Sequence, residues 1–130
     1  MPFKVTIAGG ITLKDSIESV SSRVETPNDS DAKSNYVGNV LEIVGRVGFG
    51  DPTIGLYQWS LLPSDDGQAY RNVEVEVIGE DLKTTRKVTF PNAFVADYSE
   101  TYSSTSGRGT FSIYLKQKKD KNDVVTVSGI

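Results

Sequence analysis

The chain has 130 residues, a formal net charge of −3 at pH 7, and neither histidine nor cysteine. This length fits one domain, expected to span residues 1–130. Without cysteine there are no disulfides or thiolate metal sites, and without histidine no catalytic group with an imidazole base. The acidic balance argues against a protein that mainly binds phosphates. Together these absences point away from an enzyme, although carboxylate-pair chemistry stays open.

The first residues of the sequence lack the basic segment and apolar run of a signal peptide. Apolar stretches elsewhere fall far short of the roughly 20 residues that span a bilayer. We therefore expect no membrane anchoring. We also expect a protein that is made and assembled in the cytoplasm, or that leaves by a route without a cleaved signal.

The N-terminal part reads as two strands and a long loop. Residues 3–7 alternate between apolar and polar side chains, and the glycines at 9–10 then predict a turn. Residues 11–24 are ambiguous, but their valines favour a second strand. Residues 25–35 form the one long polar segment, and loops of that length without structure of their own are usually functional.

The middle of the chain predicts a buried strand followed by the single helix. Residues 37–49 carry apolar side chains at both odd and even positions, which predicts a strand covered on both faces. Asp51 then stands as a helix N-cap and Pro52 as the first helical position. We expect a helix over residues 54–62, ended by Pro63, that packs against or between sheets.

The C-terminal half predicts further strands by its period-two alternation. The runs lie at residues 73–77, 83–90, 94–98, 111–115 and 124–127. We expect turns at residues 64–68 and 79–82, and a break at Pro91-Asn92. The chain as a whole is therefore mainly β, with about seven to nine antiparallel strands and one helix.

Two short motifs resemble ligand sites but fail on detail. The glycine-rich run at residues 45–50 lacks the Gly-Lys-Ser/Thr ending of a phosphate loop, so a turn leading into the helix is favoured. Asp29 and Asp31 have the spacing that opens a calcium loop, but Lys33 stands where a third oxygen ligand belongs. We expect no metal and no cofactor.

Glu74 and Glu76 lie two apart on a predicted strand and therefore on one face. They could form a carboxylate pair for acid–base work. Their alternation with valines favours the wet face of a half-buried sheet, open either to bulk solvent or to an enclosed channel.

Two further groups of side chains each have a functional and a structural interpretation. The basic run at residues 116–121 could contact nucleic acid. It lacks interleaved aromatic residues, so a charged hairpin turn that protects a sheet edge is favoured. Tyr98, Tyr102 and Tyr114 could form a carbohydrate platform, although scattered strand tyrosines more often pack with the hydroxyl at the surface.

Four segments resemble the tube-protein superfamily: residues 70–77 (YRNVEVEV), 86–95 (RKVTFPNAFV), 98–100 (YSE) and 107–111 (GRGTF). This superfamily includes the haemolysin-coregulated protein of type VI secretion and the tail-tube proteins of contractile phages and phage-like particles. The resemblance spans roughly residues 37–128. It implies an antiparallel β-barrel or two-sheet sandwich with one short flanking helix.

The resemblance also implies an assembly. Six copies would form a ring whose inner sheets join around a channel, and rings would stack into a tube inside sheath and baseplate proteins. The channel would carry DNA or effector cargo, and the particle would be a virion tail or an injection device driven through an envelope. The resemblance implies an inter-subunit or inter-ring loop at Pro27, Asn28, Asp29, Ser30, Asp31, Ala32, Lys33, Ser34 and Asn35. Glu74 and Glu76 are the candidates for channel-facing positions.

The leading hypothesis is therefore a self-assembling, non-enzymatic tube subunit of a contractile injection apparatus. The alternative is a monomeric β-sandwich module that binds a glycan or a protein, based on the tyrosines and the long loop. A third hypothesis is an enzyme that uses Glu74 and Glu76.

Overall fold

The computed structural model describes residues 2–25, 38–48, 50–117 and 125–129. It contains eight strands and two short helices, and the prediction of a mainly β chain with one flanking α-helix is confirmed. In chain order these are β1 (Phe3–Ile7), β2 (Ile11–Leu13), β3 (Ile17–Glu25), β4 (Gly38–Arg46), α1 (Ile54–Ser60), the 3₁₀-helix η2 (Gly67–Ala69), β5 (Arg71–Ile78), β6 (Thr84–Ser103), β7 (Arg108–Gln117) and β8 (Thr126–Gly129). The sequence predicts a turn at residues 64–68 and no 3₁₀-helix at this place.

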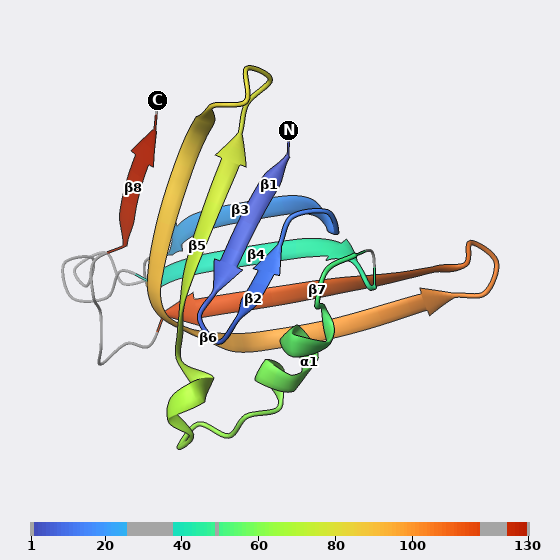
Figure 1. Ribbon diagram of the computed structural model, residues 1–130. Helices are drawn as coiled ribbons and strands as arrows, with labels where there is room; N and C mark the ends of the chain where they lie inside the picture. The colour runs from blue at the N-terminus through green and yellow to red at the C-terminus, as the bar shows by residue number, and fades with distance from the viewer. Residues whose placement is uncertain (1, 26–37, 49, 118–124, 130) are drawn as a thin grey trace.

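The strands form one antiparallel sheet, in the order β2-β1-β5-β6-β7-β4-β3, with β8 also on β6. This sheet folds into two layers because β6 is 20 residues long and pairs with β5 along its first half and β7 along its second. The β5 layer holds β2, β1, β5, β8 and residues 84–90 of β6; the β4 layer holds residues 93–103 of β6, β7, β4 and β3. Figure 1 shows β6 curving from one layer into the other, and the strands of the two layers crossing.

The turn of β6 between the layers occurs at a bulge. We expected Pro91-Asn92 to end a strand, and this is wrong, because β6 runs through both residues. The pairing register with β5 shifts here, and Asn92 has a left-handed backbone, with φ of 54°. The Asn92 N–H donates to Asn72 Oδ1 at 3.2 Å. A bulge tolerates proline, which has no N–H for the ladder, and it bends the strand that carries it.

The core lies between the two layers and is closed at one end by α1. Each layer contributes the alternating apolar side chains of its strands, such as Val75 and Phe90 from the β5 layer and Ile43 and Ile113 from the β4 layer. Trp59 of α1 is 2% exposed and packs into this core. Its indole Nε1–H donates to the Ala69 carbonyl at 2.9 Å, so the buried ring keeps a hydrogen-bond partner.

Asp51 has a different role from the helix cap that we expected. The N-cap of α1 is Thr53, and no side chain caps the helix there. Asp51 Oδ2 instead accepts hydrogen bonds from the backbone N–H groups of Lys14, Asp15 and Ser16 at 3.0, 2.9 and 2.8 Å. It also accepts one from the Ser16 hydroxyl at 2.6 Å. The carboxylate therefore joins the turn between β2 and β3 to the segment that leads into α1.

This cluster makes stability depend on pH. Burial alone would raise the pKa of Asp51, but the hydrogen bonds from Ser16, Lys14 and Asp15 outweigh it and hold the pKa below its usual value. Because the pKa is lowered in the folded state, the stabilisation is present above the ordinary carboxyl pKa. It is lost as the pH falls through the lowered pKa.

We predict that Asp51→Asn lowers the free energy of unfolding at pH 7 by about 1–2 kcal/mol, because hydrogen bonds to a neutral acceptor are weaker. In urea unfolding, the difference from the wild type should shrink below about pH 4. Asp15→Asn is the matched control, since the Asp15 side chain takes no part in the cluster, and it should change little. If the difference in unfolding free energy between the wild type and Asp51→Asn did not depend on pH, this would contradict the role given to the charge of Asp51.

Candidate functional site

The β4 layer has a long unpaired edge on each side. Within the described ranges, β3 has nine residues and its strand partner is β4 alone. At the other side, residues 94–103 of β6 pair with β7 alone. The β5 layer ends instead in β2, of three residues, and β8, of four. Long edges with unused N–H and C=O groups are templates for pairing with another chain, whereas short edge strands discourage it.

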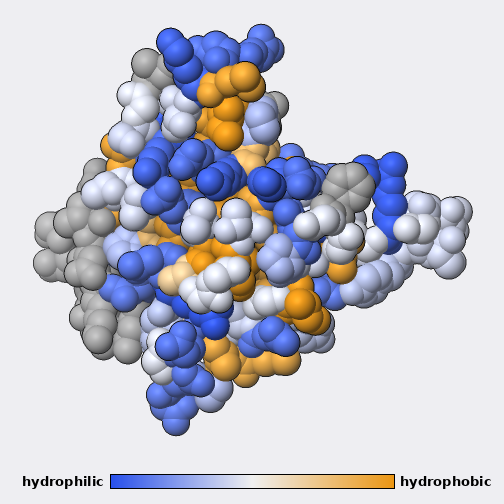
Figure 2. Space-filling model, in the orientation of Figure 1, coloured by the Kyte–Doolittle hydropathy of each residue, from blue (hydrophilic) through white to orange (hydrophobic). Residues whose placement is uncertain are grey.

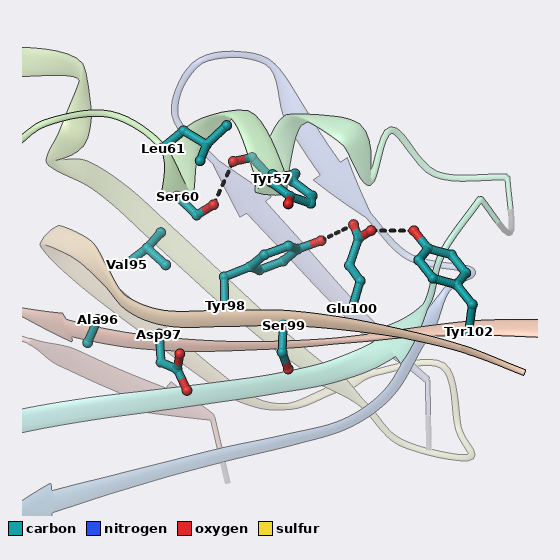
Figure 3. A pocket seen from close by; sticks show the side chains of 10 residues that line it. All are labelled: Tyr57, Ser60, Leu61, Val95, Ala96, Asp97, Tyr98, Ser99, Glu100 and Tyr102. Carbon is teal, nitrogen blue, oxygen red and sulfur yellow. Dashed lines mark hydrogen bonds between the residues drawn. The ribbon is translucent and has the colours of Figure 1, made fainter.

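A hollow lies beside the free edge of β6, between that strand and α1. It has a volume of about 460 Å³ and is lined by Tyr57, Ser60, Leu61, Val95, Ala96, Asp97, Tyr98, Ser99, Glu100 and Tyr102. Figure 3 shows the side chains of Tyr98, Glu100 and Tyr102 on the side of β6 that faces α1, while those of Asp97 and Ser99 point the opposite way.

Glu100 is held in this hollow by two tyrosines. The Tyr98 hydroxyl donates to Glu100 Oε1 at 2.5 Å, and the Tyr102 hydroxyl donates to Oε2 (Figure 3). The Tyr57 ring meets the Tyr98 ring edge-on, with centroids 5.4 Å apart. Burial, and then the hydrogen bond to Glu100, raise the pKa of Tyr98; the bond to Glu100 is the main cause that raises the pKa of Tyr102. Both hydroxyls therefore stay protonated donors at neutral pH.

Large apolar side chains are exposed around the hollow and on the opposite edge of the same layer. Tyr57, Leu61 and Tyr102 are 43%, 69% and 65% exposed. On β3, Val24 is 63% exposed. Figure 2 shows apolar side chains gathered on the surface over α1. Clusters of exposed apolar residues mark interaction surfaces more often than single ones do.

Sequence reasoning named Tyr98 and Tyr102 but missed their link through Glu100. Their spacing of two on a strand could have shown that the three share a face. Tyr57 carried no such signal, because only the tertiary fold brings α1 to β6. Tyr114, the third member of the predicted carbohydrate platform, lies elsewhere: it pairs with Asp97 and Glu42 on the outer face of the β4 layer. The platform of three tyrosines is therefore not assembled.

Glu74 and Glu76 lie on the outer, polar face of the β5 layer, while Val73 and Val75, which alternate with them, are buried. Glu74 Oε1 is 3.3 Å from Lys87 Nζ, and both side chains are partly exposed. The predicted position on a wet face is thus observed, whereas their position relative to a channel stays a prediction. Residues 27–35, the predicted inter-ring loop, lie outside the described residues, as do residues 118–121 of the basic run.

The glycine-rich run at residues 45–50 has a structural explanation at its first position. Gly45 lies so close to its neighbours that an added Cβ would come within 2.4 Å of the Ser16 carbonyl oxygen and 2.7 Å of the Phe111 ring. A packing need therefore explains this glycine. Across the residues that the structure describes, no three acidic side chains gather as a metal site. Nor does any helix there have the length and apolar character to cross a membrane.

We predict that Glu100→Gln lowers the pKa of both tyrosines. In an alkaline titration followed by tyrosinate absorbance, the pKa of Tyr102 should fall back towards its ordinary value, since its shift comes mainly from Glu100. Tyr98 should keep part of its shift, because burial is its first cause. Glu76→Gln, the same exchange on the other layer, should leave the titration unchanged. An unchanged titration in Glu100→Gln would contradict the hydrogen-bonded trio.

Comparison with known proteins gives fold relatives. No family model matches the chain, and no curated protein does. Among solved structures, Hcp1 from Flavobacterium johnsoniae matches with a TM-score of 0.65 and 17% identity, over 100% of this chain and 97% of that one. A chain in the sheath-tube complex of an extracellular contractile injection system, PVC, matches with a TM-score of 0.60 and 13% identity, over 98% and 88%.

The anti-feeding prophage baseplate, solved with six-fold symmetrisation, also contains a similar chain, with a TM-score of 0.58 and 11% identity over 98% of this chain and 91% of that one. These likenesses extend over nearly the whole of each chain but at low identity, so they establish the fold. The fold implied by the resemblance to tube proteins is confirmed. The chain shares its fold with Hcp1, with a chain of a sheath-tube complex and with a chain of a prophage baseplate structure.

Proposed function

We propose that this chain is a structural subunit that assembles into closed rings, and that stacked rings form the inner tube of a contractile injection apparatus. Two observations support the proposal. The fold is that of Hcp1 and of a chain in a sheath–tube complex. Among the residues that the structure describes, the β4 layer presents long unpaired edges on both sides, which a ring of identical copies would pair with one another.

The directions of the strands are the main support for this proposal. Within the β4 layer, β6, β7, β4 and β3 are antiparallel in succession, so β3 runs opposite to β6. A neighbour related by rotation about a ring axis keeps its strand directions. Its β6 therefore arrives antiparallel to β3, and the alternation continues across each junction. Four strands from each copy would form one closed antiparallel wall, which leaves no edge exposed.

In this arrangement the channel faces the outer surface of the β4 layer, because the other surface is packed into the core. The prediction that Glu74 and Glu76 face the channel would instead need the β5 layer to form the wall. The short edges β2 and β8 make that layer the weaker candidate. The role of residues 27–35 in contacts between subunits or rings is retained as part of the proposal.

The task proposed here is mechanical rather than enzymatic. Six copies per ring is the number suggested by the six-fold symmetrised relative. The partners would be further copies of the chain, a sheath and a baseplate. The channel would carry DNA or an effector, and the assembled particle would leave the cytoplasm in which it forms. The monomeric binding module remains the second candidate, because tyrosines and a carboxylate line an open hollow.

We predict that the purified chain at high concentration forms rings or stacked tubes in negative-stain electron microscopy. Pairing of the two edges of the β4 layer drives this association, so a concentration series should shift the population from monomers to rings. A glycan array should show no saturable sugar binding. A persistent monomer without annular particles, together with saturable binding of a sugar, would contradict the proposal and favour the binding module.

A further inference from the structure

The two free edges of the β4 layer carry complementary rows of side chains. On β3, the residues on the core side are Ile17, Val20, Ser22 and Val24, and those on the outer side are Ser19, Ser21 and Arg23. On the free half of β6, the core side holds Tyr98, Glu100 and Tyr102, and the outer side holds Asp97, Ser99 and Thr101. A junction between copies must match core side with core side, because a slip of one residue would turn every side chain to the wrong face.

Face matching and strand length together favour one antiparallel register. Setting Ser22 opposite Tyr98 keeps all of β3 within the free edge of β6, residues 94–103. Slipping by two residues in either direction also matches the faces, but it leaves part of β3 without a partner. In the favoured register, residues 19–23 face residues 101–97, a stretch in which neither strand has a register shift.

On the outer face, this register sets hydroxyl side chains opposite hydroxyl side chains and a positive charge opposite a negative one. Arg23 lies opposite Asp97, Ser21 opposite Ser99, and Ser19 opposite Thr101. Opposite charges and hydroxyl pairs directly across two strands are stabilising arrangements. Arg23 already donates from Nη2 to the Tyr114 hydroxyl at 2.8 Å. Its guanidinium group has five N–H donors, so the same side chain can reach a carboxylate on the neighbouring copy as well.

On the core side, the register brings the exposed valine of β3 to the hollow of the next copy. Val24 lies beyond Ser22 and so reaches the end of the hollow formed by Val95 and Leu61 (Figure 3). Val24 and Leu61 are 63% and 69% exposed in the single chain. Covering both removes apolar surface from water on each side of the junction. The two tyrosine hydroxyls hold the Glu100 carboxylate in place, so the hollow also contains a fixed polar group.

We infer that the hollow beside α1 is the docking site for strand β3 of a second copy, with Arg23 of one copy opposite Asp97 of the next. The inference rests on the proposed ring function and adds the register, the charge pair and the apolar contact. It makes the contact heterologous, because different surfaces of the two copies meet; such contacts form rings when they close.

A charge exchange tests the register. Arg23→Asp sets two carboxylates together and should raise the concentration for half-maximal ring formation, followed by light scattering, by about tenfold or more. Asp97→Arg should do the same, and the double variant Arg23→Asp/Asp97→Arg should restore assembly. Lys83→Asp, on the turn between β5 and β6, makes the same change of net charge as Arg23→Asp and should assemble normally. Single variants that assemble at the wild-type concentration, or no rescue in the double variant, would overturn the register.

Cross-linking tests the hollow independently, because the chain has no cysteine of its own. The variant Val24→Cys/Leu61→Cys, treated with a short bismaleimide, should give a ladder of covalent oligomers up to the full ring. The control Val127→Cys/Leu61→Cys replaces an equally exposed valine of β8, which is 58% exposed, and should give none.

The outcomes separate the two proposals. Rings without a ladder, or an equal ladder in the control, would overturn the docking site and leave the tube function standing. A chain that forms neither rings nor a ladder at any concentration would overturn both.

Discussion

The rest of this structure depends on one constraint: the backbone N–H and C=O groups along a strand edge need hydrogen-bond partners. The β5 layer ends in strands of three and four residues, which offer little to a neighbour. The β4 layer ends in nine residues of β3 and in the free half of β6. In a solitary molecule these edges would invite disordered aggregation. Because the four strands of the layer alternate in direction, a rotated copy would satisfy both edges at once, and in the proposed ring the same groups that threaten solubility would become the means of assembly.

The long strand β6 makes this arrangement possible. Its bulge at Pro91-Asn92 carries the chain from the β5 layer to the β4 layer without ending the strand. The second half thereby leaves β5 behind and exposes an edge, while α1 packs beside it to form the hollow. Asp51 fixes the segment before α1 to the turn between β2 and β3, which precedes the opposite edge strand. One carboxylate thus ties together the elements that flank both edges.

Much of the fold could be predicted because alternation is a local signal. The strands at residues 3–7, 71–78 and 108–117 follow it closely, and their valines, isoleucines and phenylalanines fill the core. Pro91-Asn92 was misread as a break because a bulge and a turn use the same residues. Asp51 was misread as a helix cap because its true partners lie far away in the sequence. The hollow depends on β6 meeting α1, and no local pattern of residues encodes that meeting.

The most direct test is an electron cryomicroscopy map of the assembled ring or tube at a resolution that separates strands. The account predicts antiparallel pairing of β3 of one copy with the free half of β6 of the next, with Arg23 opposite Asp97. It also predicts that the outer face of the β4 layer lines the channel. Rings joined through β2 and β8, with Glu74 and Glu76 lining the channel, would contradict it.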